Sequence, residues 1–175
     1  PGITETSWLV GLMQKVYILL TIIVLSFLTY EYFAVQNPKL LSYLSLAQQR
    51  GFVPNSFEVA FYRGSHLCVF LGNVGFTLIV LAMLYPLRKA FPHLFKYFGN
   101  KALWLDFHNF AGFLGTFLVL FHTGFEFTLN FGSMGMGALC FVMLTGMFGR
   151  FLYQVIPRGV AGTELKVRDI DEEDK

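Results

Sequence analysis

Four long stretches of this sequence carry almost no charge, and they restrict the possible folds more than any motif does. They run from about Val16 to Ala34, from about His66 to Leu87, from about Ala102 to Phe127 and from about Gly135 to Ile156. The hydrocarbon core of a bilayer is roughly 30 Å thick and a helix rises about 1.5 Å per residue, so a crossing needs about 20 apolar residues. We therefore expect four transmembrane segments.

Composition and local pattern decide how these segments cross. Charged residues make up 14% of the chain and the mean hydropathy is +0.57, whereas a soluble domain carries roughly 25% charged residues. Backbone polar groups in lipid must be satisfied internally, which leaves helices or a closed barrel. A barrel needs alternating segments of about ten residues, but LLTIIVLSFL is continuously apolar. We predict an all-α integral membrane four-helix bundle.

The connections between the apolar stretches are polar. Residues 36–63 are predicted to form a loop that holds a short helix at LLSYLSLAQQ. The connection 88–101 mixes four basic residues with Phe and Tyr, which favours an interfacial segment between the second and third helices. We predict one transmembrane domain over residues 1–162 and an acidic, disordered cytoplasmic tail over residues 163–175.

The basic residues predict the orientation in the membrane. With four crossings, both termini and the 88–101 connection share one side, which carries Lys15, Arg88, Lys89, Lys96, Lys101, Arg150, Arg158, Lys166, Arg168 and Lys175. The other side has only Lys39, Arg50 and Arg63. Positive residues stay on the cytoplasmic side, so both termini are expected in the cytoplasm. The net charge of +2 is too mild to indicate a nucleic-acid partner.

Two histidines lie on one stripe of the third stretch. His108 and His122 are 14 residues apart, which places them within about 40° of one helix face and about 21 Å apart along the axis. Gly112 and Gly115 fall between them on that stripe, so the face should form a groove without side chains between two imidazoles. Ionisable groups inside membranes are costly and usually functional.

The antiparallel second helix offers a partner for each of these histidines. His66 opens it on the side where His122 lies, and His93 follows it on the side of His108. Two imidazoles that face each other across a flat space are what bis-histidine haem iron requires. We therefore predict that His66 pairs with His122 and that His93 pairs with His108 as metal ligands.

Three polar residues are candidates for contacts with the edge of such a cofactor. Haem propionates need cations near the membrane faces, where Arg63 and Lys101 lie. Asn73 lies on the helix face of His66 and is expected to hydrogen-bond a neighbouring helix or the cofactor.

Each of these residue types also has a structural interpretation. A histidine at a helix end, His93 above all, can be an interfacial residue without a ligand. Small residues at helical spacing let helices pack closely without a cofactor, and this applies to Gly72, Gly75, Gly146 and Gly149. Arg150 is expected to snorkel to the surface. Cys68 and Cys140 are too few for a disulfide framework and are expected to be inert buried thiols.

The third stretch, DFHNFAGFLGTFLVLFHTG from Asp106 to Gly124, resembles the haem-binding helix of membrane b-type cytochromes, with thirteen residues between its histidines and glycines in the gap. The block GRFLYQVIPRG from Gly149 to Gly159 is similar to the last-helix ending of small bacterial membrane proteins in the same broad group, which includes the cytochrome b and ferric-reductase-like families. The resemblance covers roughly residues 60–160. It implies two haem b groups and a place in the bacterial inner membrane.

The chain departs from the ferric-reductase-like pattern in ways that limit the implied function. Those domains usually have more helices and a second paired-histidine helix, and this sequence has no nucleotide-binding glycine motif. The resemblance thus implies an electron-transfer subunit of an oxidoreductase complex rather than a self-sufficient enzyme. Its expected partners are cytochrome or iron–sulfur subunits, a quinone and membrane lipid. The alternatives are a non-catalytic membrane anchor or assembly subunit and a single-haem version.

Overall fold

The computed structural model describes residues 2–155 except residues 96, 98, 127 and 129. This part of the chain is helical without a strand and contains α1 (Gly2–Gln36), α2 (Tyr43–Gln49), α3 (His66–Ala82), α4 (Leu84–Ala90), α5 (Lys101–His122) and α6 (Phe131–Val155). Four segments are long and apolar enough to cross a membrane: Trp8–Gln36, His66–Ala90, Lys101–His122 and Phe131–Leu152. The predicted all-α class and the four membrane-length helices are confirmed. The predicted tail over residues 163–175 lies outside the described residues.

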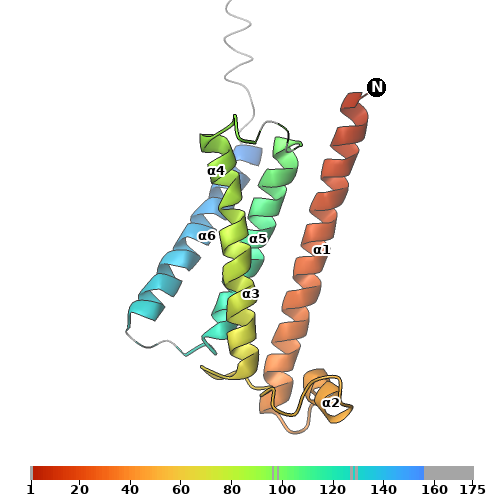
Figure 1. Ribbon diagram of the computed structural model, residues 1–175, viewed down its shortest axis with the longest axis vertical. Coiled ribbons are helices and arrows are strands. Elements are labelled where there is room, and N and C mark those ends of the chain that lie inside the picture. The colour runs from red at the N-terminus through yellow and green to blue at the C-terminus, as the bar shows by residue number, and fades with distance from the viewer. Residues whose placement is uncertain (1, 96, 98, 127, 129, 156–175) are drawn as a thin grey trace, which may run out of the picture. The chain divides into compact units, whose positions relative to one another are not determined.

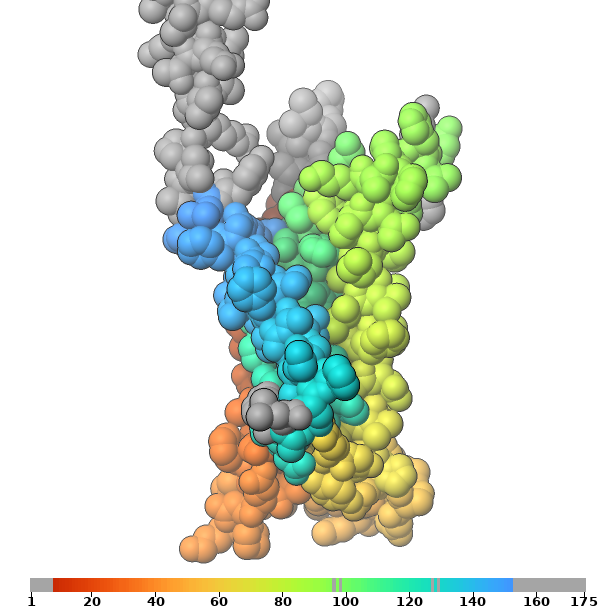
Figure 2. Space-filling view, turned by 90° about the vertical axis from the view of Figure 1, so that its left-hand side faces the viewer, coloured from red at the N-terminus to blue at the C-terminus, as the bar shows by residue number. Residues whose placement is uncertain are grey.

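The chain divides into two compact units, Pro1–Leu139 and Cys140–Lys175, so the boundary lies within α6. In the first unit α3 packs along α5, and α1 packs against α5 (Figure 1). The helices α1 and α5 run in one direction and α3 runs in the other, as successive crossings of a membrane require. The column of α3 and α4 extends along this unit, with α4 at one end and the segment around α2 at the other (Figure 2).

The helices α3 and α5 touch backbone to backbone at two glycines. A Cβ atom added at Gly75 would lie 2.8 Å from the carbonyl oxygen of Gly115, and one added at Gly115 would lie 2.9 Å from that of Gly75. Small residues let membrane helices approach in this way, because lipid offers no hydrophobic drive for association and packing must supply it. The buried side chains of Leu71, Leu114 and Leu118 belong to the core beside this crossing.

The second apolar segment is broken near its end. The first part, α3, ends at Ala82, and Pro86 lies in the first turn of α4. Proline has no N–H, so the carbonyl four residues earlier, that of Ala82, loses its helical partner. We expected one segment that ends near Leu87, but the structure has a break at Met83, after which the chain continues as a helix to Ala90.

The third apolar helix ends earlier than predicted. We expected it to reach Phe127, but α5 ends at His122. Gly124 follows with a φ of +61°, the left-handed conformation in which many helices end on a glycine. Phe125 also has a positive φ, of 59°, and its ring packs against that of Tyr32 at a centroid distance of 5.1 Å. Aromatic packing therefore holds the turn that stops α5.

The polar segment after α1 contains the predicted short helix, α2, and Glu31 attaches it to α1. The Glu31 side chain is fully buried. Its carboxylate accepts hydrogen bonds from the Ser42 hydroxyl at 2.7 Å, from the Tyr43 N–H at 2.7 Å and from the Leu44 N–H at 3.4 Å. The first N–H groups of a helix lack partners within it and favour negative charge, which explains a buried carboxylate at this position.

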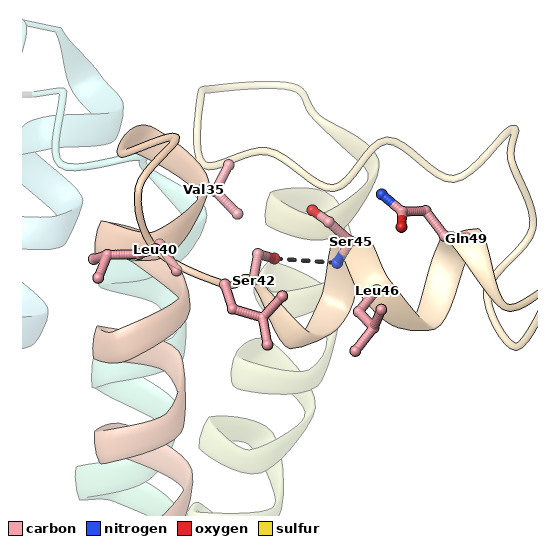
Figure 3. A pocket seen from close by; sticks show the side chains of 8 residues that line it. Val35, Leu40, Ser42, Ser45, Leu46 and Gln49 are labelled. Atoms are coloured by element: carbon pink, nitrogen blue, oxygen red, sulfur yellow. Dashed lines mark hydrogen bonds between the residues drawn. The ribbon is translucent and has the colours of Figure 1, made fainter.

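A hollow of about 230 Å³ lies beside this cap, between the end of α1 and α2. Figure 3 shows Ser42 in its wall, accepting a hydrogen bond from the backbone N–H of Ser45 at 3.1 Å. Val35, Leu40 and Leu46 supply apolar parts of the wall. The serine that donates a hydrogen bond to Glu31 therefore also lines this hollow.

Replacing Glu31 by Ala should loosen α2. The Ser42 hydroxyl and the Tyr43 N–H would lose their acceptor, at a cost of about 1–3 kcal/mol for each group left buried and unpaired. Limited proteolysis in the 50–56 turn should be faster than in the wild type. The matched control is Gln36→Ala, which changes an exposed residue at the end of α1. Equal cleavage rates for Glu31→Ala and the wild type would contradict the capping role.

Arg88 stabilises the opposite end of this unit. We expected this residue among the cytoplasmic basic residues, and the structure buries it. Its guanidinium donates a hydrogen bond to the Gly99 carbonyl at 2.6 Å and lies 5.2 Å from the centroid of the Trp104 ring, within range of a cation–π interaction. Arg88 thus ties the connection between α4 and α5 to the start of α5. The interfacial placement of this connection stays a prediction.

Candidate functional site

The two histidines of α5 bind α3 through the same ring nitrogen. The Nδ1 atom of His122 lies 2.8 Å from the carbonyl oxygen of Cys68, and that of His108 lies 2.8 Å from the carbonyl oxygen of Ala82. A carbonyl oxygen can only accept, so Nδ1 carries a proton in both rings. In the neutral imidazole Nε2 therefore keeps its lone pair, as a metal ligand must.

Local sequence explains why each of these hydrogen bonds can form. Pro86 leaves the carbonyl of Ala82 without its helical partner, and this carbonyl is the acceptor for His108. At the other end, Gly72 makes room for the ring of His122, because a Cβ atom there would lie 2.5 Å from Nδ1 and 2.6 Å from Cγ of that ring. Pro86 in α4 and Gly72 in α3 thus provide the positions that the two imidazoles occupy.

His122 lines a cavity of about 290 Å³ within the first unit. The other lining residues come from α5, from the first turns of α6 and from the loop before α3: Val119, Thr123, Gly132, Gly135, Met136, Leu139 and Arg63. Pockets for small organic ligands span roughly 300–1,000 Å³, so this cavity lies just below that range. It combines an imidazole, a cation, a thioether and a wall with two glycines.

Arg63 reaches this cavity from a loop that the turn after α5 supports. A Cβ atom added at Gly124 would lie 3.1 Å from the Phe61 carbonyl oxygen and 3.3 Å from the Arg63 nitrogen, so the two backbones are in contact. The hydrogen bond from Tyr62 to Glu58 is the main cause that raises the pKa of the Tyr62 hydroxyl above its ordinary value. Tyr62 therefore stays neutral, and Arg63 is the charge that this loop presents to the cavity.

His108 is half-buried at the other end of α5, beside α4. Its ring centroid lies 5.3 Å from that of Tyr85, with 37° between the ring planes. Lys101 is exposed two turns earlier, on nearly the same helix face. One turn after His108, a Cβ atom added at Gly112 would meet nothing within 4 Å. An imidazole, a cation and open space thus share one face at this end.

His66 and Asn73 lie on the opposite side of α3 from α5. The α5-facing residues of α3 are Cys68, Gly72 and Gly75. At about 100° per residue, His66 and Asn73 point within about 20° of each other and about 100–180° away from that set. Both side chains are exposed, and the His66 ring lies 6.0 Å from that of Phe57. The structure therefore does not bring His66 to His122.

Two further predicted residues are placed differently from the expected groove. Gly115 packs against the backbone of α3 at Gly75, so that part of the stripe is filled by a helix. His93 lies in the exposed turn after α4, and the ring that the structure places beside His108 is that of Tyr85. The predicted pairing of His93 with His108 stays a prediction.

The donor set limits what kind of metal these sites can take. Within the described part of the chain, no three His, Cys, Asp or Glu side chains gather around a possible metal position. Both cysteines are free; Cys68 is buried and its Sγ lies 3.4 Å from the Phe121 carbonyl oxygen, while Cys140 is partly exposed. One imidazole can hold only a metal that brings other ligands with it, as haem iron does.

Comparisons with protein-family models, with curated proteins and with solved structures find no match. The functional argument therefore depends on the geometry around His108 and His122.

Proposed function

We propose that this chain is a membrane subunit that binds b-type haem and carries electrons, with His122 and His108 as ligands of one haem each. The observation that carries the proposal is the pair of Nδ1–H···O=C hydrogen bonds to α3, each 2.8 Å long. These hydrogen bonds fix the orientation of both rings. They leave the lone pair of each Nε2 atom available to bind a metal. Metal-binding histidines almost always donate their other ring N–H to a carbonyl, a carboxylate or water.

Two features of the surroundings of His122 support a haem there. The porphyrin supplies the in-plane nitrogens, so few protein ligands are needed. Arg63 lines the same cavity as His122 and would pair with a propionate. Gly132 and Gly135 leave their part of the wall without side chains. A bound haem would supply iron that accepts and releases one electron, while this chain holds and orients it.

The spacing of the two histidines suits transfer across a membrane. Their helix positions are about 21 Å apart along α5, a large part of the roughly 30 Å hydrocarbon core. We place one site near each face of a four-helix bundle in a bacterial inner membrane, with both termini in the cytoplasm. Cytochrome or iron–sulfur subunits or a quinone would exchange electrons with these sites. His93 remains the proposed second ligand beside His108.

A non-catalytic membrane anchor is the second candidate, and one observation favours it. The contact between Gly75 and Gly115 shows that α3 and α5 are adapted to pack on each other. Hydrogen bonds from His108 and His122 would then only join these helices, at about 0.6–2 kcal/mol each. This candidate predicts that loss of both histidines leaves complex assembly and electron flow intact.

Vesicles with trapped ferricyanide distinguish the two candidates. With a membrane-impermeant reductant outside, wild-type protein in the vesicle membrane should reduce the trapped ferricyanide. His108→Ala and His122→Ala should each fall close to the rate of protein-free vesicles. The control is Asn109→Ala, at a partly exposed neighbour on α5 whose amide donates a hydrogen bond to the Leu105 carbonyl, and it should keep the wild-type rate. A wild-type rate equal to that of protein-free vesicles would favour the anchor.

Replacing Gly72 by Ala should weaken haem binding at His122 without touching the ligand itself. The added methyl group would overlap the imidazole, and its displacement breaks the hydrogen bond to Cys68. Loss of such a supporting contact costs about 10–100-fold in metal affinity, which haem titration of the apoprotein would measure. Gly137→Ala, at a glycine with nothing within 4 Å of the added Cβ, is the control. Equal affinities for both variants would contradict the supporting role of Gly72.

A further inference from the structure

The cavity at His122 contains a second side chain that can bind iron. Met136 is only 4% exposed, and among the α6 residues whose side chains the structure describes it is the one buried residue. Met134, two residues earlier, is 69% exposed. The contrast on a single helix turn shows that Met136 faces the interior of the protein, where it lines the cavity at His122.

Helix geometry directs Met136 and His122 into the cavity from different helices. Gly132, Gly135, Met136 and Leu139 line it from α6, and their spacings of three and four residues place them on one helix face. Two of these four have no side chain and Leu139 is a hydrocarbon. Among these four, Met136 is thus the residue of α6 whose side chain can donate an electron pair to a metal, and it lines the same cavity as the imidazole from α5.

We propose that the Met136 thioether, rather than His66, is the second axial ligand of the haem bound by His122; this inference rests on the proposed haem site at His122. Methionine with histidine is an established axial pair for haem iron. A neutral thioether also adds no charge to an apolar site, where charge is costly. His66 is exposed on the far side of α3, whereas Met136 and His122 line one cavity.

The ligand set has a consequence for the two sites. A methionine ligand raises the reduction potential of haem relative to a second histidine. A haem held by His122 and Met136 would therefore be reduced more easily than one held by His108 and His93. Electrons would pass from the His108 end of α5 toward the His122 end.

Met136→Leu tests this inference, with Met134→Leu as the matched control on the same helix. In the ferric wild type we expect the weak near-infrared band that sulfur–iron charge transfer produces. Met136→Leu should lose this band and lower the reduction potential of one haem, while Met134→Leu and His66→Ala should keep both properties. Met136→His provides a second test that retains a ligand: the band should disappear and the haem should stay six-coordinate.

The outcomes separate this inference from the function on which it rests. Wild-type protein that binds haem at His122 without a sulfur–iron band would overturn the methionine ligand alone. The same holds if the band persists in Met136→Leu, or if His66→Ala makes the haem five-coordinate. A wild type without haem would overturn the proposed function together with this inference.

Discussion

His122→Ala is expected to remove the haem at the cavity and to leave the haem at His108 in place. The substitution deletes the Nε2 donor and the Nδ1–H that bonds the Cys68 carbonyl, so neither the ligand nor its support remains. The Met136 thioether alone would hold haem iron only weakly. The haem content per chain, from the pyridine haemochrome absorbance, should fall by about half if each histidine holds one haem.

Controls separate loss of a ligand from loss of the fold. The His122 side chain also joins α5 to α3, so helix content and thermal unfolding in detergent must be compared with those of the wild type. His122→Gly with added imidazole should regain haem, because the free ligand can occupy the vacated position. Asn109→Ala should keep the full haem content. Unchanged haem content in a folded His122→Ala variant would contradict the assignment of this ligand.

Gly75→Ala is expected to separate α3 from α5 and to weaken both histidine contacts at once. The added Cβ would lie 2.8 Å from the Gly115 carbonyl oxygen and 3.0 Å from the Leu118 Cβ. A backbone carbonyl within a helix cannot rotate away, so the helices must move apart. Overpacking of this kind costs about 1–3 kcal/mol, and the Nδ1–H···O=C bonds of His108 and His122 would lengthen on either side of the crossing.

Thermal unfolding in detergent and haem content together measure this effect. Gly75→Ala should lower both the unfolding temperature and the haem content per chain, whereas a substitution confined to one site should remove only one haem equivalent. Gly146→Ala is the control, since an added Cβ there meets nothing within 4 Å. If Gly75→Ala unfolds at the wild-type temperature with full haem content, the crossing at Gly75 and Gly115 does not determine the spacing of the two helices.

The class of the fold could be predicted because hydropathy over some 20 residues depends little on tertiary contacts. The ends of the helices could not be predicted, because they depend on single residues within apolar sequence. The end of α5 at His122 is set by Gly124 and the ring of Phe125, and neither interrupts the hydropathy. The break before Pro86 could have been predicted from the sequence, because the position of the proline implies that the Ala82 carbonyl loses its hydrogen-bond partner.

The candidate site was harder to predict than the fold. Helical periodicity places His108 and His122 on one stripe, and both do contact α3. The pairing of His66 with His122 requires knowing which face of α3 meets α5, and only the contacts of Cys68 and Gly72 define that face. The sequence alone does not point to Met136, because methionine is ordinary in apolar stretches and its proposed role depends on a cavity formed by three segments.

The pyridine haemochrome spectrum of the purified protein is the most direct test of the proposed haem sites. The comparison should pair the wild type with the double variant His108→Ala/His122→Ala, both produced in haem-sufficient cells. We expect haem b in the wild type and none in a folded double variant. A wild type without a Soret band, or a double variant with the same haem content per chain as the wild type, would contradict haem binding by the histidines of α5.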